Sequence, residues 1–172
     1  IEIGIPFSDP VAEGPVIQEA DDRALSAGVT TDKIFDTVDD IADKIHVPIV
    51  FMTYINPIYV YGVEKFAKRA KACGAAGVIV PDVPFEEKEE IRGSFEAEGL
   101  VVISMVAPTS ADRVRMIAKE AKGFLYCVSS LGVTGVRTEI GTAIGDLIQT
   151  VKEECSIPCA IGFGISTPEQ AE

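Results

Sequence analysis

Residues 1–5 read Ile1-Glu2-Ile3-Gly4-Ile5, an alternation of apolar with polar or small residues that is typical of a β-strand. In such a strand Glu2 and Gly4 point to one face and the three isoleucines point to the other. This pattern suits a barrel strand whose isoleucines lie under helices and whose glutamate faces the barrel lumen. The segment therefore favours a (β/α) barrel over an open, doubly wound sheet.

Further apolar runs, most of them rich in the β-branched residues that strands prefer, lie at 47–52, 76–80, 100–105, 124–128 and 158–163. Between them, apolar residues recur at helical spacing over 34–45, 63–70 and 114–121. Gly74 and Gly123 follow the second and third of these segments, where a helix end favours glycine. Six strands that alternate with amphipathic helices predict a parallel sheet covered by helices. No linker composition divides residues 1–172, which are expected to form a single barrel domain.

The composition excludes several classes of partner. The chain has 27 acidic and 15 basic residues and a net charge of −12, which argues against binding to nucleic acid or to an anionic membrane. Charged residues make up 24% of the sequence and interrupt the apolar segments too often for a membrane span. The four cysteines do not follow the spacing of a disulfide scaffold, a zinc site or a redox motif. We expect a reduced, cytoplasmic protein.

Turn-forming and small polar residues gather after the predicted strands, at 6–15, 53–57, 81–84, 107–109 and 129–135. The loops at the carboxyl ends of the strands form the active sites of barrel enzymes. For any one of these loops taken alone, ordinary turn chemistry is the stronger explanation. Glycine clusters at 132–135 and 162–166 follow two successive strands, and their backbone N–H groups could hold a phosphate.

Three side chains are candidates for catalysis. Glu2 would be a natural general acid or base if its strand desolvates it, although a glutamate at a chain end can equally be solvated. Glu13 lies in a loop where a surface glutamate is the default interpretation, and two carboxylates in different environments can divide acid and base roles. Tyr126 shares a face with Phe124 and Val128, which is compatible with core filling or with a lumen position.

The motif Glu2-Ile3-Gly4-Ile5-Pro6-Phe7-Ser8-Asp9-Pro10, followed by Gly14-Pro15-Val16-Ile17-Gln18, resembles the signature of the tryptophan synthase alpha chain family. Later motifs occur in the same order as in that family, at 53–57, 81–84, 129–135 and 162–170. The resemblance covers the whole chain. It implies an eight-stranded (β/α) TIM barrel that cleaves indole-3-glycerol phosphate to indole and glyceraldehyde 3-phosphate, a carbon-carbon lyase of tryptophan biosynthesis.

The resemblance also implies roles for individual residues. Glu2 matches the catalytic glutamate that moves protons in the retro-aldol cleavage, Tyr126 matches the tyrosine beside it, and Glu13 matches an aspartate that accepts the indole N–H. Positions around the indole ring are matched by Met52, Tyr54, Ile79, Met105 and Phe163. Thr134 and Gly135 fall on the loop that closes over the substrate, and Gly135 and Gly164 match backbone contacts to the phosphate.

The same resemblance implies a beta chain as the partner, in an alpha2beta2 tetramer, with the loops that carry Pro6, Asp9 and Asn56 facing it. Pyridoxal phosphate is expected only on that beta chain, and the alpha chain is expected to have no cofactor and no metal. The substrate is expected to be a small phosphorylated indole compound.

Two features depart from the family pattern. Glu13 stands where the family has aspartate. Family members also begin with a further strand and helix and end with a further βα unit, which implies that this chain is an incomplete barrel with about six of the eight strands. Two other functions stay open: another phosphate-binding barrel enzyme of biosynthesis, or a regulatory subunit with little turnover of its own.

Overall fold

The structure is a computed structural model that describes residues 1–128, 142–162, 165, and 167–168. Its backbone contacts divide the chain into two compact units. The first contains Ile1–Val11 and Pro15–Val102, and the second contains Ala12–Gly14 and Ile103–Glu172. The single domain expected from the sequence stays a prediction.

The first unit contains three parallel strands, β1 (Glu2–Gly4), β2 (Val50–Met52) and β3 (Gly77–Ile79), and the start of β4 (Val101–Val106). Its helices are α1 (Pro15–Ser26), α2 (Thr31–Ala42), α3 (Ile55–Tyr61), α4 (Val63–Ala72), the 3₁₀-helix η1 (Phe85–Glu87) and α5 (Glu89–Ala97). The strands are paired in chain order, and their last residues, Gly4, Met52 and Ile79, are level with one another.

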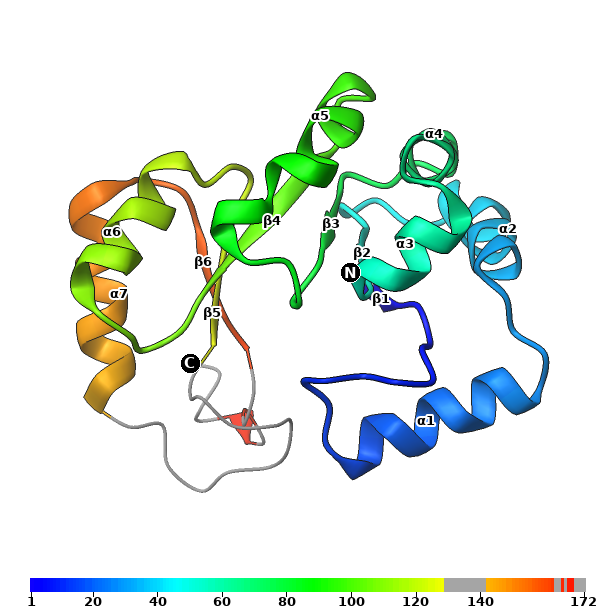
Figure 1. The fold of residues 1–172 in the computed structure, drawn as a ribbon, viewed down its shortest axis with the longest axis horizontal. Helices are drawn as coiled ribbons and strands as arrows, with labels where there is room; N and C mark the ends of the chain where they lie inside the picture. The colour runs from blue at the N-terminus through cyan, green and yellow to red at the C-terminus, as the bar shows by residue number, and fades with distance from the viewer. Residues whose placement is uncertain (129–141, 163–164, 166, 169–172) are drawn as a thin grey trace. The chain divides into compact units, whose positions relative to one another are not determined.

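The second unit contains the rest of β4, then α6 (Ala111–Glu120), β5 (Leu125–Val128), α7 (Thr142–Glu154) and β6 (Cys159–Gly162). Strands β4, β5 and β6 are parallel and paired in chain order. Helices α6 and α7 lie side by side (Figure 1). Each of the six apolar runs in the sequence thus corresponds to one strand, and the prediction of parallel strands that alternate with helices is confirmed.

The core of the first unit lies between its strands and helices α2, α4 and α5. Phe35, Phe51, Phe66 and Phe95 are fully buried there. The ring of Phe35 lies 5.1 Å from that of Phe66 and 5.2 Å from that of Phe51, both in edge-on contact. Edge-on aromatic pairs add to the stabilisation from buried apolar area, so this cluster holds the helices against the strands.

The helical segments predicted from apolar spacing are present with shifted ends. The period over 34–45 corresponds to α2, which begins earlier because Thr30 caps it: the Thr30 hydroxyl accepts a hydrogen bond from the Lys33 N–H at 3.3 Å. Gly74 follows α4 with a φ of 85°, the left-handed conformation that a glycine tolerates best.

One loop prediction is wrong in part. Residues 53–57 contain Asn and Pro and were expected to form a turn, but Ile55, Asn56 and Pro57 form the first turn of α3. Proline is tolerated in the first turn of a helix because the N–H groups there have no partner within the helix. The residue types that favour a turn therefore also allow a helix to begin.

Candidate functional site

Three predicted substrate contacts gather at the carboxyl ends of β2 and β3. Met52 and Ile79 are the last residues of these strands and are directly paired in the parallel register. Ile79 is fully buried, and Met52 is half-buried. Tyr54 follows two residues after Met52, and 4% of its surface is exposed. The tertiary structure thus places a thioether, a branched alkyl group and an aromatic ring at the carboxyl ends of two adjacent strands, a combination suited to an apolar ligand.

Glu2 begins β1, where the predicted alternation is confirmed. Ile3 packs against the core cluster and Ile5 belongs to it, whereas Glu2 and Gly4 are exposed on the opposite face. The Glu2 side chain is thus exposed in the structure. A carboxylate on the face opposite the helix-packed isoleucines is available to a ligand, and it does not carry the cost of an isolated buried charge.

Tyr126 lies in the middle of β5, and its register partner on β4 is Met105. Leu125 and Cys127 are buried on one face of the strand, while Tyr126 and Val128 are half-buried on the other. The two second-unit residues expected near the substrate, Met105 and Tyr126, are therefore neighbours across one strand pair.

The ring of Tyr126 packs directly against the backbone of Gly162 on β6. A Cβ atom built at Gly162 would lie 2.2 Å from the Tyr126 hydroxyl oxygen and 2.3 Å from its Cε1 atom. Real Cβ atoms do not approach other heavy atoms so closely. Gly162 is therefore the residue that leaves room for the ring, a role that no local pattern in the sequence indicates.

Glu13 is half-buried in the segment between β1 and α1, and it groups with the second unit together with Ala12 and Gly14. The residues expected to face a partner lie in the first unit. Pro6 is half-buried, Asp9 is exposed and accepts a 2.5 Å hydrogen bond from the Ser8 hydroxyl, and Asn56 is exposed in the first turn of α3.

Four predicted substrate residues, Thr134, Gly135, Phe163 and Gly164, lie outside the described residues. Among the residues that the structure does describe, no group of three or more His, Cys, Asp and Glu side chains is placed to hold a metal ion. Nor does any helix of that part have the length and apolar character to cross a membrane.

The thiol next to Tyr126 in the sequence is not an activated nucleophile. Cys127 is fully buried on the other face of β5. Burial first, and then the neighbouring Cys159 thiol, raise the pKa of Cys127 to about 12. A thiol with this pKa is protonated at neutral pH and therefore unreactive, so Cys127 contributes to packing.

A further polar residue at the strand ends, Asp82, belongs to the motif at 81–84 but was not expected to be a site residue. Its carboxylate Oδ1 accepts a hydrogen bond from the backbone N–H of Ile55 at 3.0 Å, across 27 positions of sequence. This bond joins the loop after β3 to the start of α3. No local signal in the sequence indicates such a long-range partner.

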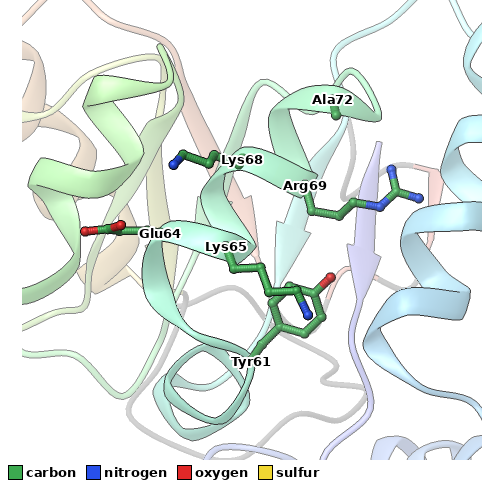
Figure 2. A pocket seen from close by; sticks show the side chains of 6 residues that line it. All are labelled: Tyr61, Glu64, Lys65, Lys68, Arg69 and Ala72. Carbon is green, nitrogen blue, oxygen red and sulfur yellow. The ribbon is translucent and has the colours of Figure 1, made fainter.

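A surface pocket of about 500 Å³ lies elsewhere, on α4 (Figure 2). It is lined by Tyr61, Glu64, Lys65, Lys68, Arg69 and Ala72, none of which is a predicted site residue. Lys65 folds over the Tyr61 ring, with its Nζ atom 4.2 Å from the ring centre. Arg69 points away toward α2, where its guanidinium donates to Asp36 and to Asp39. These contacts join α2, α3 and α4 and give Lys65 and Arg69 a structural role.

Comparisons with known proteins agree with the motif pattern. A family model described as tryptophan synthase alpha chain matches residues 1–172. A tryptophan synthase alpha chain of Lacticaseibacillus casei is 48% identical over the whole of this chain and 65% of its own length. One from Thermoanaerobacter sp. (strain X514) is 46% identical over the whole chain and 66% of its own length. The chain therefore spans slightly less than two thirds of these curated relatives.

Solved structures give the same result. A structure of the tryptophan synthase a2b2 complex from Pyrococcus furiosus, described for its mutual activation, has a TM-score of 0.88 at 40% identity, over 98% of this chain and 68% of that one. The tryptophan synthase subunit alpha of Campylobacter jejuni has a TM-score of 0.86 at 35% identity, over 98% of this chain and 68% of that one. The expected α/β barrel class is confirmed by these matches, and the chain belongs to the tryptophan synthase alpha chain family.

Proposed function

We propose that the intact protein is the alpha subunit of a tryptophan synthase and cleaves indole-3-glycerol phosphate to indole and glyceraldehyde 3-phosphate. The observation that carries this proposal is the family match over all 172 residues. The motif at residues 2–10 resembles the family signature, and this resemblance implies that Glu2 is the catalytic glutamate. Its exposed position on β1, opposite the isoleucines of the core, supports a role in contact with substrate.

Glu2 moves the protons of the cleavage. Its carboxylic acid form protonates C3 of the indole ring, and its carboxylate form takes the proton of the adjacent glycerol hydroxyl. The oxygen then forms the carbonyl of glyceraldehyde 3-phosphate, and the electrons of the broken carbon-carbon bond return to the ring. Glu13 accepts the indole N–H and stabilises the positive charge that develops on the ring nitrogen. Tyr126 positions the reacting groups.

The remaining residues bind the substrate. Met52, Tyr54, Ile79, Met105 and Phe163 surround the indole, and Thr134 lies on the loop that closes over it. Gly135 and Gly164 hold the phosphate through backbone N–H groups, a suitable arrangement in a chain with a net charge of −12 that repels anions at long range.

The partner is a tryptophan synthase beta chain in an alpha2beta2 tetramer, and the loops with Pro6, Asp9 and Asn56 face it. The Pyrococcus furiosus relative, which is described as an a2b2 complex, supports this assembly. Pyridoxal phosphate belongs to the beta chain, and the alpha chain works without a cofactor or metal of its own. The complex works in the cytoplasm.

The test compares Glu2→Gln with Glu19→Gln, the same change at an exposed position on α1. Cleavage of indole-3-glycerol phosphate by the intact protein is measured with and without a beta chain. Glu2→Gln should lower kcat by about 10²-fold or more, because an amide keeps the shape but cannot exchange the proton. Glu19→Gln should leave kcat unchanged.

Two outcomes would contradict the proposal. Near-normal turnover by Glu2→Gln would remove Glu2 from the mechanism. A parent protein without turnover that still activates a beta chain would instead indicate a regulatory subunit.

A further inference from the structure

The first turn of α3 does not supply its own cap. Tyr54 is the N-cap residue, with extended backbone angles (φ −82°, ψ 163°), and its side chain makes no capping hydrogen bond. The side chains that usually cap this position are Ser, Thr, Asp and Asn, which are short enough to reach the first free N–H groups. Pro57, in the same turn, has no N–H.

Asp82 provides the missing acceptor from another loop. Its Oδ1 atom lies 3.0 Å from the backbone nitrogen of Ile55, the first residue of α3. Asp82 is half-buried, so water screens this bond less than it would at a fully exposed position. A carboxylate at a helix N-terminus is also the sign of charge that the helix favours there.

A second bond holds the residue before Tyr54. The Thr53 N–H donates to the carbonyl oxygen of Ile79 at 3.1 Å, and Thr53 is itself 1% exposed. Hydrogen bonds therefore join the residue before Tyr54 to β3 and the residue after Tyr54 to the loop that follows β3. Loss of the Asp82 bond would leave only the bond before Tyr54 to hold this part of the backbone.

The Tyr54 side chain depends on this backbone. Its ring is buried and packs at 5.6 Å from the ring of Phe7, which lies in the loop after β1. A small rotation of the backbone at Ile55 would change the direction of the Cα–Cβ bond of Tyr54 and move the ring out of this contact.

We propose that Asp82 is a positioning residue, which caps α3 from the neighbouring loop and thereby holds Tyr54 in its place among the substrate contacts. The substrate role of Tyr54 rests on the proposed function, whereas the cap itself does not. Asp82 acts through Ile55 and Tyr54 and takes no part in the proton transfers.

The experiment uses three variants of the intact protein. Asp82→Ala removes the acceptor, Asp82→Asn keeps an oxygen of the same reach without the charge, and Asp40→Ala is the matched control at an exposed position on α2. Amide hydrogen exchange at Ile55 reports the capping bond directly and needs no substrate. Steady-state cleavage of indole-3-glycerol phosphate reports the position of Tyr54.

Asp82→Ala should lose protection at the Ile55 amide and raise KM by about tenfold with a smaller change in kcat, because substrate positioning is lost while the proton-transferring groups stay. Asp82→Asn should keep the protection and return KM to within about threefold of the parent, because a neutral acceptor makes a weaker bond of the same geometry. Asp40→Ala should match the parent in both measurements.

The two hypotheses fail in different ways. If the parent cleaves the substrate and Asp82→Ala keeps both its KM and its Ile55 protection, the positioning role is wrong and the proposed function stands. If Asp82→Asn loses protection as fully as Asp82→Ala, the oxygen acceptor is not what holds α3, and the inference also fails. If the parent does not cleave the substrate, the proposed function is wrong, and the exchange at Ile55 still decides whether Asp82 caps the helix.

Discussion

Among the described glycines of the first unit, Gly77 on β3 has the closest neighbour to an added Cβ atom. A Cβ atom added there would lie 2.3 Å from the carbonyl oxygen of Val101 and 3.2 Å from its carbonyl carbon. An ordinary carbon-oxygen contact is about 3.3 Å, so Gly77→Ala requires the two backbones to separate by about 1 Å. No side chain can rotate to relieve the contact, because both groups belong to the main chain.

The cost of this substitution follows from the bonds around it. Overpacking in a core typically costs about 1–3 kcal/mol. The neighbouring bond from the Val101 N–H to the Ala76 oxygen, now 3.0 Å long, would be stretched, with a net loss of about 1 kcal/mol. Alanine also restricts the unfolded chain more than glycine does, which stabilises the folded state by about 0.4–1 kcal/mol. We expect Gly77→Ala to lower the free energy of unfolding by about 2 kcal/mol.

Gly93→Ala is the matched control. Gly93 lies inside α5, and a Cβ atom there meets nothing within 4 Å. Alanine is the better helix former, so this variant should be more stable than the parent by about 0.5–1 kcal/mol.

The assay is urea unfolding of the intact protein. With a slope of about 2 kcal/mol per molar urea, Gly77→Ala should lower the midpoint by about 1 M, and Gly93→Ala should raise it slightly. The reasoning would be refuted by a Gly77→Ala variant within about 1 kcal/mol (about 0.5 M urea) of the parent, or by equal stability of the two variants.

Three further outcomes are expected. Gly162→Ala should displace the Tyr126 ring, because the added Cβ would lie 2.2 Å from its hydroxyl oxygen. This variant should lower kcat by about tenfold or more. A crystal structure of the variant with an unmoved ring would contradict this expectation. Tyr61 should ionise near pH 12, because burial first and then its hydrogen bond to Asp32 raise the pKa to about 12. Its contribution to stability is therefore complete below pH 10 and is lost as the pH rises from 10 through about 12, a loss that Tyr61→Phe should abolish in alkaline unfolding curves. Glu13→Asp should keep most of the activity, since any carboxylate that reaches the indole N–H can accept its hydrogen bond, whereas Glu13→Ala should lose about 10²-fold in kcat/KM. An alanine variant as active as the parent would leave Glu13 without a catalytic role.

The elements of the fold are largely readable from local patterns. The alternation around Glu2 identified the strand and its two faces, because successive side chains of a strand point in opposite directions. The helical period before Gly74 identified α4, and its buried residues are among the apolar ones that the spacing selected. Helix α3 was missed because its Asn and Pro are compatible with a turn and with a first helical turn alike. Helices α1 and α7 were not selected by the apolar spacing either.

For the candidate site too, local motifs select the residues and the tertiary structure decides their surroundings. Met52, Tyr54 and Ile79 were selected by motif, and their convergence at adjacent strand ends follows from a parallel register that motifs alone do not specify. Glu2 was assigned to a face by its strand, but whether it is desolvated depends on what surrounds it, and in the structure it is exposed.

The sequence by itself determined where the strands and three of the helices lie and which family the motifs belong to, because both depend on residues that are close along the chain. Only the tertiary structure decided that Asp82 caps α3 and that Gly162 makes room for Tyr126. Each of these pairs joins residues at least 27 positions apart, brought together by strand pairing across helical crossovers. A contact of this kind leaves no periodicity in the sequence, since its two members are neighbours only after the chain has folded.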